Sequence, residues 1–130
     1  MSIFSRLGDI ISSNINAMLD KAENPEKMVK LIIQEMEDTL IEIKANCAGA
    51  MATEKRIQRE MAAAAAMGRG WNDKAMLAID RDRPDLAREA LFEKRRYIER
   101  AEALEREQEE AHEVVGQYQQ DIQQLEEKLA

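Results

Sequence analysis

Few residues of this sequence have the types and spacing that catalysis or metal binding requires. Glu109 and His112 lie three positions apart, which matches half of the Glu-x-x-His pattern that binds paired metal ions in four-helix bundles. That chemistry needs a second such motif and further carboxylates, and His112 is the one histidine of the chain. We therefore interpret His112 as a solvated side chain and expect neither a metal ion nor another cofactor.

The one cysteine and the glycine-rich stretch lack the neighbours that would make them reactive. Cys47 has Lys44 nearby but no histidine within its helix to activate it, so we interpret it as a small buried apolar residue. One cysteine also excludes an intramolecular disulfide and fits a reducing, cytoplasmic compartment. Gly68 and Gly70 flank Arg69, but no Lys-Ser/Thr pair follows them, as a phosphate-binding loop would require. The sequence therefore predicts a protein that is not an enzyme.

Composition and charge favour long helices that act through their surfaces. The 130 residues include 19 Lys and Arg against 26 Asp and Glu, for a net charge of −7, and only 4% are aromatic. This length allows one domain, and so few aromatic residues do not favour a thick globular core. Basic side chains at 94–96 and at Arg100 are surrounded by acidic ones, so we do not expect direct nucleic-acid binding.

The first 23 residues form a predicted amphipathic helix, because at 100° per residue their apolar side chains fall on one side. The side-chain charges of residues 1–22 cancel, so attachment to lipid has to come from apolar insertion. Charges within the segment argue against a signal peptide or a membrane span. Two interpretations are open, since the apolar stripe either packs on the rest of the protein or inserts into a membrane. The residues expected to contact lipid are Ile3, Phe4, Leu7, Ile10, Ile11, Ile15, Met18 and Leu19.

A second helix is predicted to begin at Pro25, because Asn24 can cap it and proline loses no hydrogen bond at the first helical position. We interpret Asn24 and Pro25 as a hinge. Beyond them, apolar residues recur at alternating steps of four and three, the pattern of a coiled-coil seam. A helix from about 25 to 80 needs a partner helix along its length. The first seam consists of Val29, Ile33, Met36, Leu40, Ile43, Cys47, Ala50, Glu54, Ile57, Met61, Ala64, Gly68, Trp71, Ala75 and Ala78.

The chain can reverse direction within residues 80–85. Here Asp82 is the expected cap of a new helix, and Arg83 and Pro84 complete the turn and open that helix. The helix from about 84 to 130 carries a second seam of the same pattern. We therefore predict an all-α fold, a long antiparallel coiled-coil hairpin over residues 24–130 that follows the short amphipathic helix. The second seam consists of Ala87, Ala90, Lys94, Tyr97, Ala101, Leu104, Gln108, Ala111, Val115, Tyr118, Ile122, Leu125 and Leu129.

Four seam residues are expected to set the register of the two helices. If the turn centres near residue 82, facing residues have numbers that add to about 165. Lys94 then lies over Trp71 as a cation–π contact, and Glu54 lies near Gln108. Because the narrow seams face each other, the hairpin offers no obvious groove for the N-terminal stripe, which favours a membrane or another subunit as its partner.

Four long strings carry a family resemblance: IFSRLGDI (3 to 10), NINAMLDKAENPEK (14 to 27), IIQEMEDTLIEIK (32 to 44) and RPDLAREALFEK (83 to 94). In this order and spacing they resemble the phage shock protein A family, a relative of the vesicle-inducing protein of plastids and of the ESCRT-III superfamily. The resemblance covers essentially the whole chain, less sharply over 45–80 and after 100. Gly68 and Gly70 depart from the family pattern, and the family continues for several further helices.

The resemblance implies a bacterial envelope-stress protein with two linked activities. In unstressed cells it would bind and inhibit the AAA+ activator of sigma-54 transcription. Under stress it would move to the cytoplasmic face of the inner membrane, bind anionic lipid through the N-terminal stripe, oligomerise and maintain membrane integrity. Phage-shock membrane sensor proteins are further implied partners. The alternative is a purely structural, ESCRT-III-like membrane-remodelling scaffold without a transcriptional role.

Overall fold

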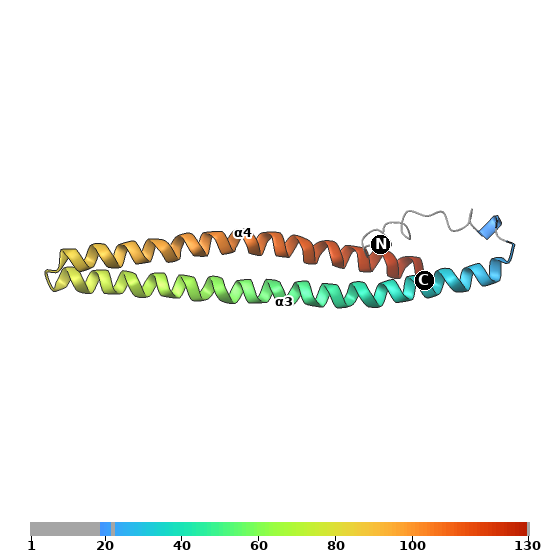
Figure 1. Ribbon diagram of the computed structural model, residues 1–130, viewed down its shortest axis with the longest axis horizontal. Coiled ribbons are helices and arrows are strands. Elements are labelled where there is room, and N and C mark those ends of the chain that lie inside the picture. Colours follow the sequence, from blue (N-terminus) through green and yellow to red (C-terminus); the bar gives the residue numbers. More distant parts are fainter. Residues whose placement is uncertain (1–18, 22, 130) are drawn as a thin grey trace. The chain divides into compact units, whose positions relative to one another are not determined.

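The computed structural model describes residues 19–21 and 23–129, and this part of the chain contains two long helices and no strand. Helix α3 spans Pro25–Asp80 (56 residues) and α4 spans Pro84–Leu129 (46 residues), as Figure 1 shows. The predicted all-helical fold is confirmed, and α3 continues without interruption through its glycines. The predicted N-terminal helix falls mostly on residues 1–18, outside the described residues, so of its apolar stripe only Leu19 is described.

Helix α3 begins with a capped first turn. The side-chain oxygen of Asn24 accepts a hydrogen bond from the backbone N–H of Lys27 at 3.2 Å, and the Asn24 carbonyl accepts one from the N–H of Met28 at 3.1 Å. Pro25 is the first helical residue, a position at which the N–H has no partner within the helix. Asn24 therefore caps the helix as the sequence predicts, and the hinge role of Asn24 and Pro25 stays a prediction.

Helix α3 ends in a left-handed residue that turns the chain toward α4. The backbone N–H of Arg83 donates to the Ala78 carbonyl at 2.8 Å, and the N–H of Asp82 donates to the Ile79 carbonyl at 3.0 Å. This pair of hydrogen bonds defines a Schellman ending, which needs a positive φ, and Asp82 has a φ of 53°. The prediction that Asp82 caps the next helix is therefore wrong. Asp82 ends α3. Arg83 immediately precedes Pro84, which is the first residue of α4.

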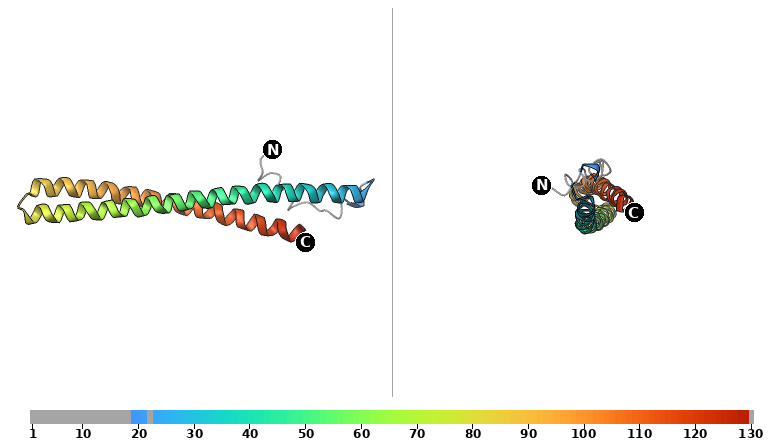
Figure 2. Two further views of the ribbon diagram at one scale, coloured as in Figure 1. Left: turned by 90° about the horizontal axis from the view of Figure 1, so that it is seen from below. Right: turned by 90° about the vertical axis from the view of Figure 1, so that its right-hand side faces the viewer.

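The two helices pair within two compact units, which we describe separately. The turn unit comprises residues 51–113, and the terminal unit lies within residues 1–50 and 114–130. In the turn unit, α3 and α4 lie side by side and antiparallel (Figure 2). The core of this unit joins Ile57 and Ala64 of α3 to Leu104 of α4. Half-buried residues complete it, namely Met61, Tyr97, Ala101 and Ala111.

The core of the terminal unit is also built from both helices. Met36 and Ile43 of α3 pack with Leu125 of α4, and Ile43 and Leu125 are 0% exposed. Because the two helices bury each other's apolar residues, packing rather than helix propensity stabilises this pair. The partly buried residues around this core are Ile32, Leu40, Tyr118, Ile122 and Leu129.

The predicted seams describe the buried residues of both helices with three exceptions, Ile33, Thr39 and Asp121. Ile33 was placed in the first seam, yet it is 42% exposed, whereas Thr39 is 0% exposed. A straight α-helix drifts about 20° per heptad from a strict seven-residue repeat, so the buried line moves to neighbouring positions. The same effect accounts for Asp121, which is buried beside Ile122.

Candidate functional site

Surface features and polar contacts, rather than a reaction centre, distinguish the described residues. This part of the chain contains no group of three or more His, Cys, Asp or Glu side chains that could hold a metal ion. Cys47 is buried, in agreement with its interpretation as an apolar residue. Across residues 19–21 and 23–129, no helix is both long enough and apolar enough to cross a membrane.

Glu54 joins the two helices of the turn unit through a polar contact in the seam. The side-chain amide of Gln108 donates to Glu54 Oε1 at 3.0 Å, and His112 Nδ1 lies 2.9 Å from the same oxygen. The Glu54 side chain is only 14% exposed, whereas that of His112 is 72% exposed. Glu54 and Gln108 are therefore neighbours, as the predicted register requires. His112 is exposed to solvent, as the sequence predicts, and it also contacts Glu54.

Lys94 makes a second polar contact between the helices, with a partner that differs from the expected one. Its ammonium donates to Asn72 Oδ1 at 2.9 Å, and the cation over the Trp71 ring is Lys74, 4.2 Å from the ring centroid. The prediction of a Lys94–Trp71 contact is therefore wrong. Lys74 lies three positions from Trp71 on the same helix, which makes the two side chains neighbours on one face. Asn72 adjoins Trp71, so Lys94 still meets the expected part of α3.

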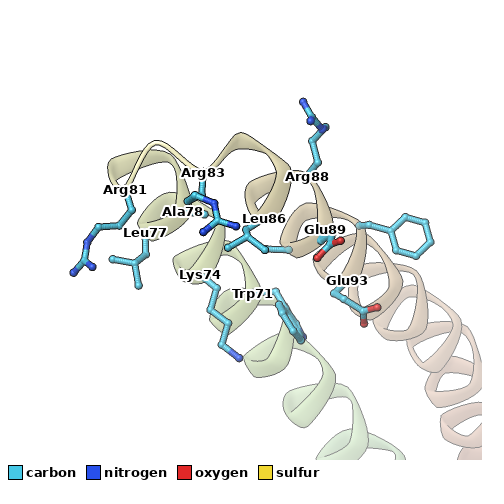
Figure 3. Close-up of a pocket in the computed structure, with 12 residues that line it drawn as sticks. Trp71, Lys74, Leu77, Ala78, Arg81, Arg83, Leu86, Arg88, Glu89 and Glu93 are labelled. Carbon is cyan, nitrogen blue, oxygen red and sulfur yellow. The ribbon is translucent and has the colours of Figure 1, made fainter.

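A groove lies beside the turn, and we call it the tip groove (Figure 3). Its volume is about 810 Å³, and side chains of both helices form its walls. Three of its large apolar residues, Leu77, Leu86 and Phe92, are exposed, with Phe92 at 66%. The lining residues are Trp71, Lys74, Leu77, Ala78, Arg81, Arg83, Leu86, Arg88, Glu89, Ala90, Phe92 and Glu93.

Arg83, on the rim of the tip groove, pairs with the first turn of α4. Its Nε and Nη2 atoms donate to the two carboxylate oxygens of Asp85, each at 3.3 Å. These hydrogen bonds, with a further one from the backbone at Leu86, hold the pKa of Asp85 below its ordinary value of 3.8. The pair is exposed, so it orders the turn more than it stabilises the fold.

The sequence matches the model of the PspA/IM30 family over residues 2–130. The chain belongs to the PspA/IM30 family. It is 36% identical over 104 residues to the membrane-associated protein Vipp1 of Nostoc punctiforme, an alignment that covers 80% of this chain and 40% of that protein. It is 55% identical over 60 residues to a phage shock protein A homolog of Bacillus subtilis, covering 46% of this chain and 26% of the relative. A homolog from Deinococcus radiodurans is 30% identical over 129 residues, covering 99% of this chain and 58% of the relative.

Family membership confirms the resemblance carried by the four strings, and the chain spans less than two thirds of each of these relatives.

Sequence reasoning missed Asn72 and Lys74, although the i, i+3 spacing of Lys74 from Trp71 could have indicated their contact. It also missed the tip groove. Most of the groove's charged and large apolar lining residues lie outside the two seams, and only the turn brings them together.

Proposed function

We propose that the chain is a peripheral, non-enzymatic effector of bacterial envelope stress. It binds anionic lipid on the cytoplasmic face of the inner membrane, and it holds the AAA+ activator of sigma-54 transcription inactive. Membership of the PspA/IM30 family supports this function, and the relative in Nostoc punctiforme is named a membrane-associated protein. We assign lipid binding to the stripe from Ile3 to Leu19 and inhibition to the hairpin.

The observation that carries the lipid assignment is that the facing helix fills most of each seam. Ile43 and Leu125 are fully buried in the terminal unit, and Ile57 and Leu104 are 4% exposed in the turn unit. Apolar side chains stabilise a fold by leaving water, and among the large apolar residues of the two seams that the structure describes only Ile33 is exposed. Insertion of that stripe into lipid removes it from water instead.

The inhibitory contact with the AAA+ activator is best placed on apolar residues of α4 that the seam does not use. Leu91 and Ile98 are 44% and 43% exposed and lie seven positions apart, on one face of the helix. Exposed apolar residues that share a face are typical of a protein-binding surface. We therefore expect Leu91→Glu/Ile98→Glu to lose inhibition of the activator and to keep lipid binding, whereas Leu91→Met/Ile98→Met keeps both.

Lipid and the activator compete for the chain in this proposal, so a membrane defect releases the activator by drawing the chain away. The test measures ATP hydrolysis by the purified activator in the presence of the full chain and of phosphatidylglycerol vesicles in increasing amounts. We expect the chain to inhibit hydrolysis and the vesicles to restore it. Inhibition that stays constant at every vesicle concentration would contradict the competition.

A second candidate function is an ESCRT-III-like scaffold that remodels membranes without controlling transcription. The similarity to Vipp1, in which 36% of 104 aligned residues are identical, is compatible with this candidate. Both candidates include self-association, and phage-shock membrane sensor proteins are expected partners only of the first. A chain that deforms vesicles but leaves the activator's ATP hydrolysis unchanged would favour the scaffold.

A further inference from the structure

The tip groove has the size of a small-molecule site and an apolar floor. Its volume of about 810 Å³ falls within the range of roughly 300–1,000 Å³ in which proteins bind small ligands. Leu77 of α3 and Leu86 of α4 line the groove, as does Phe92, and Figure 3 shows Leu77 and Leu86 on the two helices beside the turn. These side chains remain exposed in the described part of the chain, so a ligand with an apolar body would remove them from water.

Basic side chains outnumber acidic ones around this floor, with Lys74, Arg81, Arg83 and Arg88 against Glu89 and Glu93. Glu93 lines the groove, but it accepts two hydrogen bonds from Arg96, at 2.9 and 3.0 Å. Lys74, Arg81 and Arg88 have no ion-pair partner among the described residues, which leaves them free to bind an anion. The groove is thus cationic, although the chain as a whole has a net charge of −7.

Trp71 adds an unfilled hydrogen-bond donor to the same wall. Its indole N–H is buried and has no acceptor among the residues that the structure describes. The Lys74 ammonium lies over the ring, 4.2 Å from its centroid, and because an ammonium is only a donor it cannot accept a hydrogen bond from the indole N–H. An anion that enters the groove beside Lys74 would supply the partner that its ammonium lacks.

We infer that the tip groove binds a single-chain anionic amphiphile, an alkyl chain that ends in a phosphate or carboxylate. The alkyl chain lies on the floor between Leu77 and Leu86. Lys74 and Arg81 hold the head group, because they are seven positions apart on α3 and share one face. A neutral amphiphile leaves these cations without a partner, and a cationic one is repelled. None of the lining residues belongs to the N-terminal stripe, so the inference stands independently of the proposed function.

The fluorescence of Trp71 tests this site directly, because it is the one tryptophan of the chain and it lines the groove. The full chain carries Phe4→Glu and Ile11→Glu, so that the N-terminal stripe does not take up the probes. Dodecyl phosphate and dodecanoate are titrated below their critical micelle concentrations, beside dodecyl maltoside and dodecyltrimethylammonium. We expect a saturable emission change with both anions, and binding of dodecyl maltoside that is weaker by about tenfold or more.

Variants and vesicles complete the test. We expect Lys74→Gln/Arg81→Gln to weaken dodecyl phosphate binding by about tenfold, and the exposed control Lys55→Gln to leave it unchanged. Bound dodecyl phosphate should also protect Lys74, but not Lys55, from an amine-acylating reagent. Equal affinity for dodecyl phosphate and dodecyl maltoside would overturn the inference. So would a Trp71 response to phosphatidylglycerol vesicles alone, because that result would assign the groove to bilayer lipid.

Discussion

Gln108 on α4 donates its side-chain amide to Glu54 on α3 at 3.0 Å, and this bond joins the two helices of the turn unit at seam positions. The residues lie 54 positions apart in the chain, so the bond forms only in one register of the hairpin. A polar pair in an otherwise apolar seam specifies register at some cost in stability. This relationship leads to the first prediction.

Gln108→Leu should destabilise the chain by about 1 to 2 kcal/mol, because the half-buried Glu54 carboxylate loses a donor. Glu54→Leu/Gln108→Leu should recover that loss, since an apolar pair suits the seam. The measurement is a double-mutant cycle by urea denaturation. The control cycle uses Arg56 and Glu60, an exposed i, i+4 pair on α3 that should couple by about 0.5 kcal/mol or less. Equal coupling in the two cycles would show that the Glu54–Gln108 bond is not special.

Thr39 is fully buried in the terminal unit, and its hydroxyl has no hydrogen-bond partner among the described residues. Thr39→Val should therefore stabilise the chain by about 1 kcal/mol, because it removes the unsatisfied group and keeps the shape of the side chain. Thr39→Ser should destabilise it by about 1 kcal/mol, since it keeps the hydroxyl and loses a buried methyl group. Urea midpoints report both changes. A valine variant less stable than the natural chain would mean that the hydroxyl is satisfied.

Asp82 adopts a left-handed conformation, with a φ of 53°, at the end of α3. Asp82→Gly should stabilise the chain by about 1 kcal/mol, because glycine adopts this conformation without strain. Asp82→Asn separates conformation from charge, since asparagine tolerates positive φ and removes the carboxylate from the helix C-terminus. Asp82→Val should destabilise the chain. Thermal midpoints followed by circular dichroism measure the series, and a valine variant as stable as the glycine variant would contradict the left-handed turn.

The Arg83–Asp85 pair predicts a small dependence of the turn on acid. Arg83 lowers the pKa of Asp85 below its ordinary value of 3.8. The pair therefore stabilises the folded turn at pH values above 3.8, and this stabilisation is lost as the pH falls through the lowered pKa of Asp85. Carbon-detected NMR titration of the Asp85 carboxyl measures this pKa. We expect Arg83→Gln to raise it toward 3.8 and Arg88→Gln to leave it unchanged. The same titration midpoint in both variants would show that Arg83 does not act on Asp85.

The periodicity of the sequence predicts most of the fold because it records which residues must leave water. It places Ile43, Ile57 and Leu104 in the seams, and all three are buried. It misplaces Ile33 and omits Thr39, since a strict repeat does not include the drift of a straight helix.

Side-chain partners were harder to predict than helices. The register alone places Lys94 near Trp71. The group that the Lys94 ammonium contacts depends on side-chain geometry, and in the structure the acceptor is Asn72. The role of Asp82 was missed for a related reason, since aspartate is common both as a helix cap and in left-handed turns. The tip groove depends on non-seam residues that only the folded turn assembles.

Vesicle co-sedimentation tests most directly the central claim that the filled seams leave the N-terminal stripe for lipid. Phosphatidylglycerol vesicles are mixed with the natural chain, with a chain lacking residues 1–22, and with the variant Phe4→Glu/Ile11→Glu. In this variant, placing each glutamate near hydrocarbon costs about 2 to 3 kcal/mol. Phe4→Leu/Ile11→Leu is the matched control. We predict that the natural chain and the leucine control sediment with the vesicles, while the shortened chain and the glutamate variant stay in solution with the hairpin of α3 and α4 still folded. Sedimentation of all four chains to the same extent would contradict the claim.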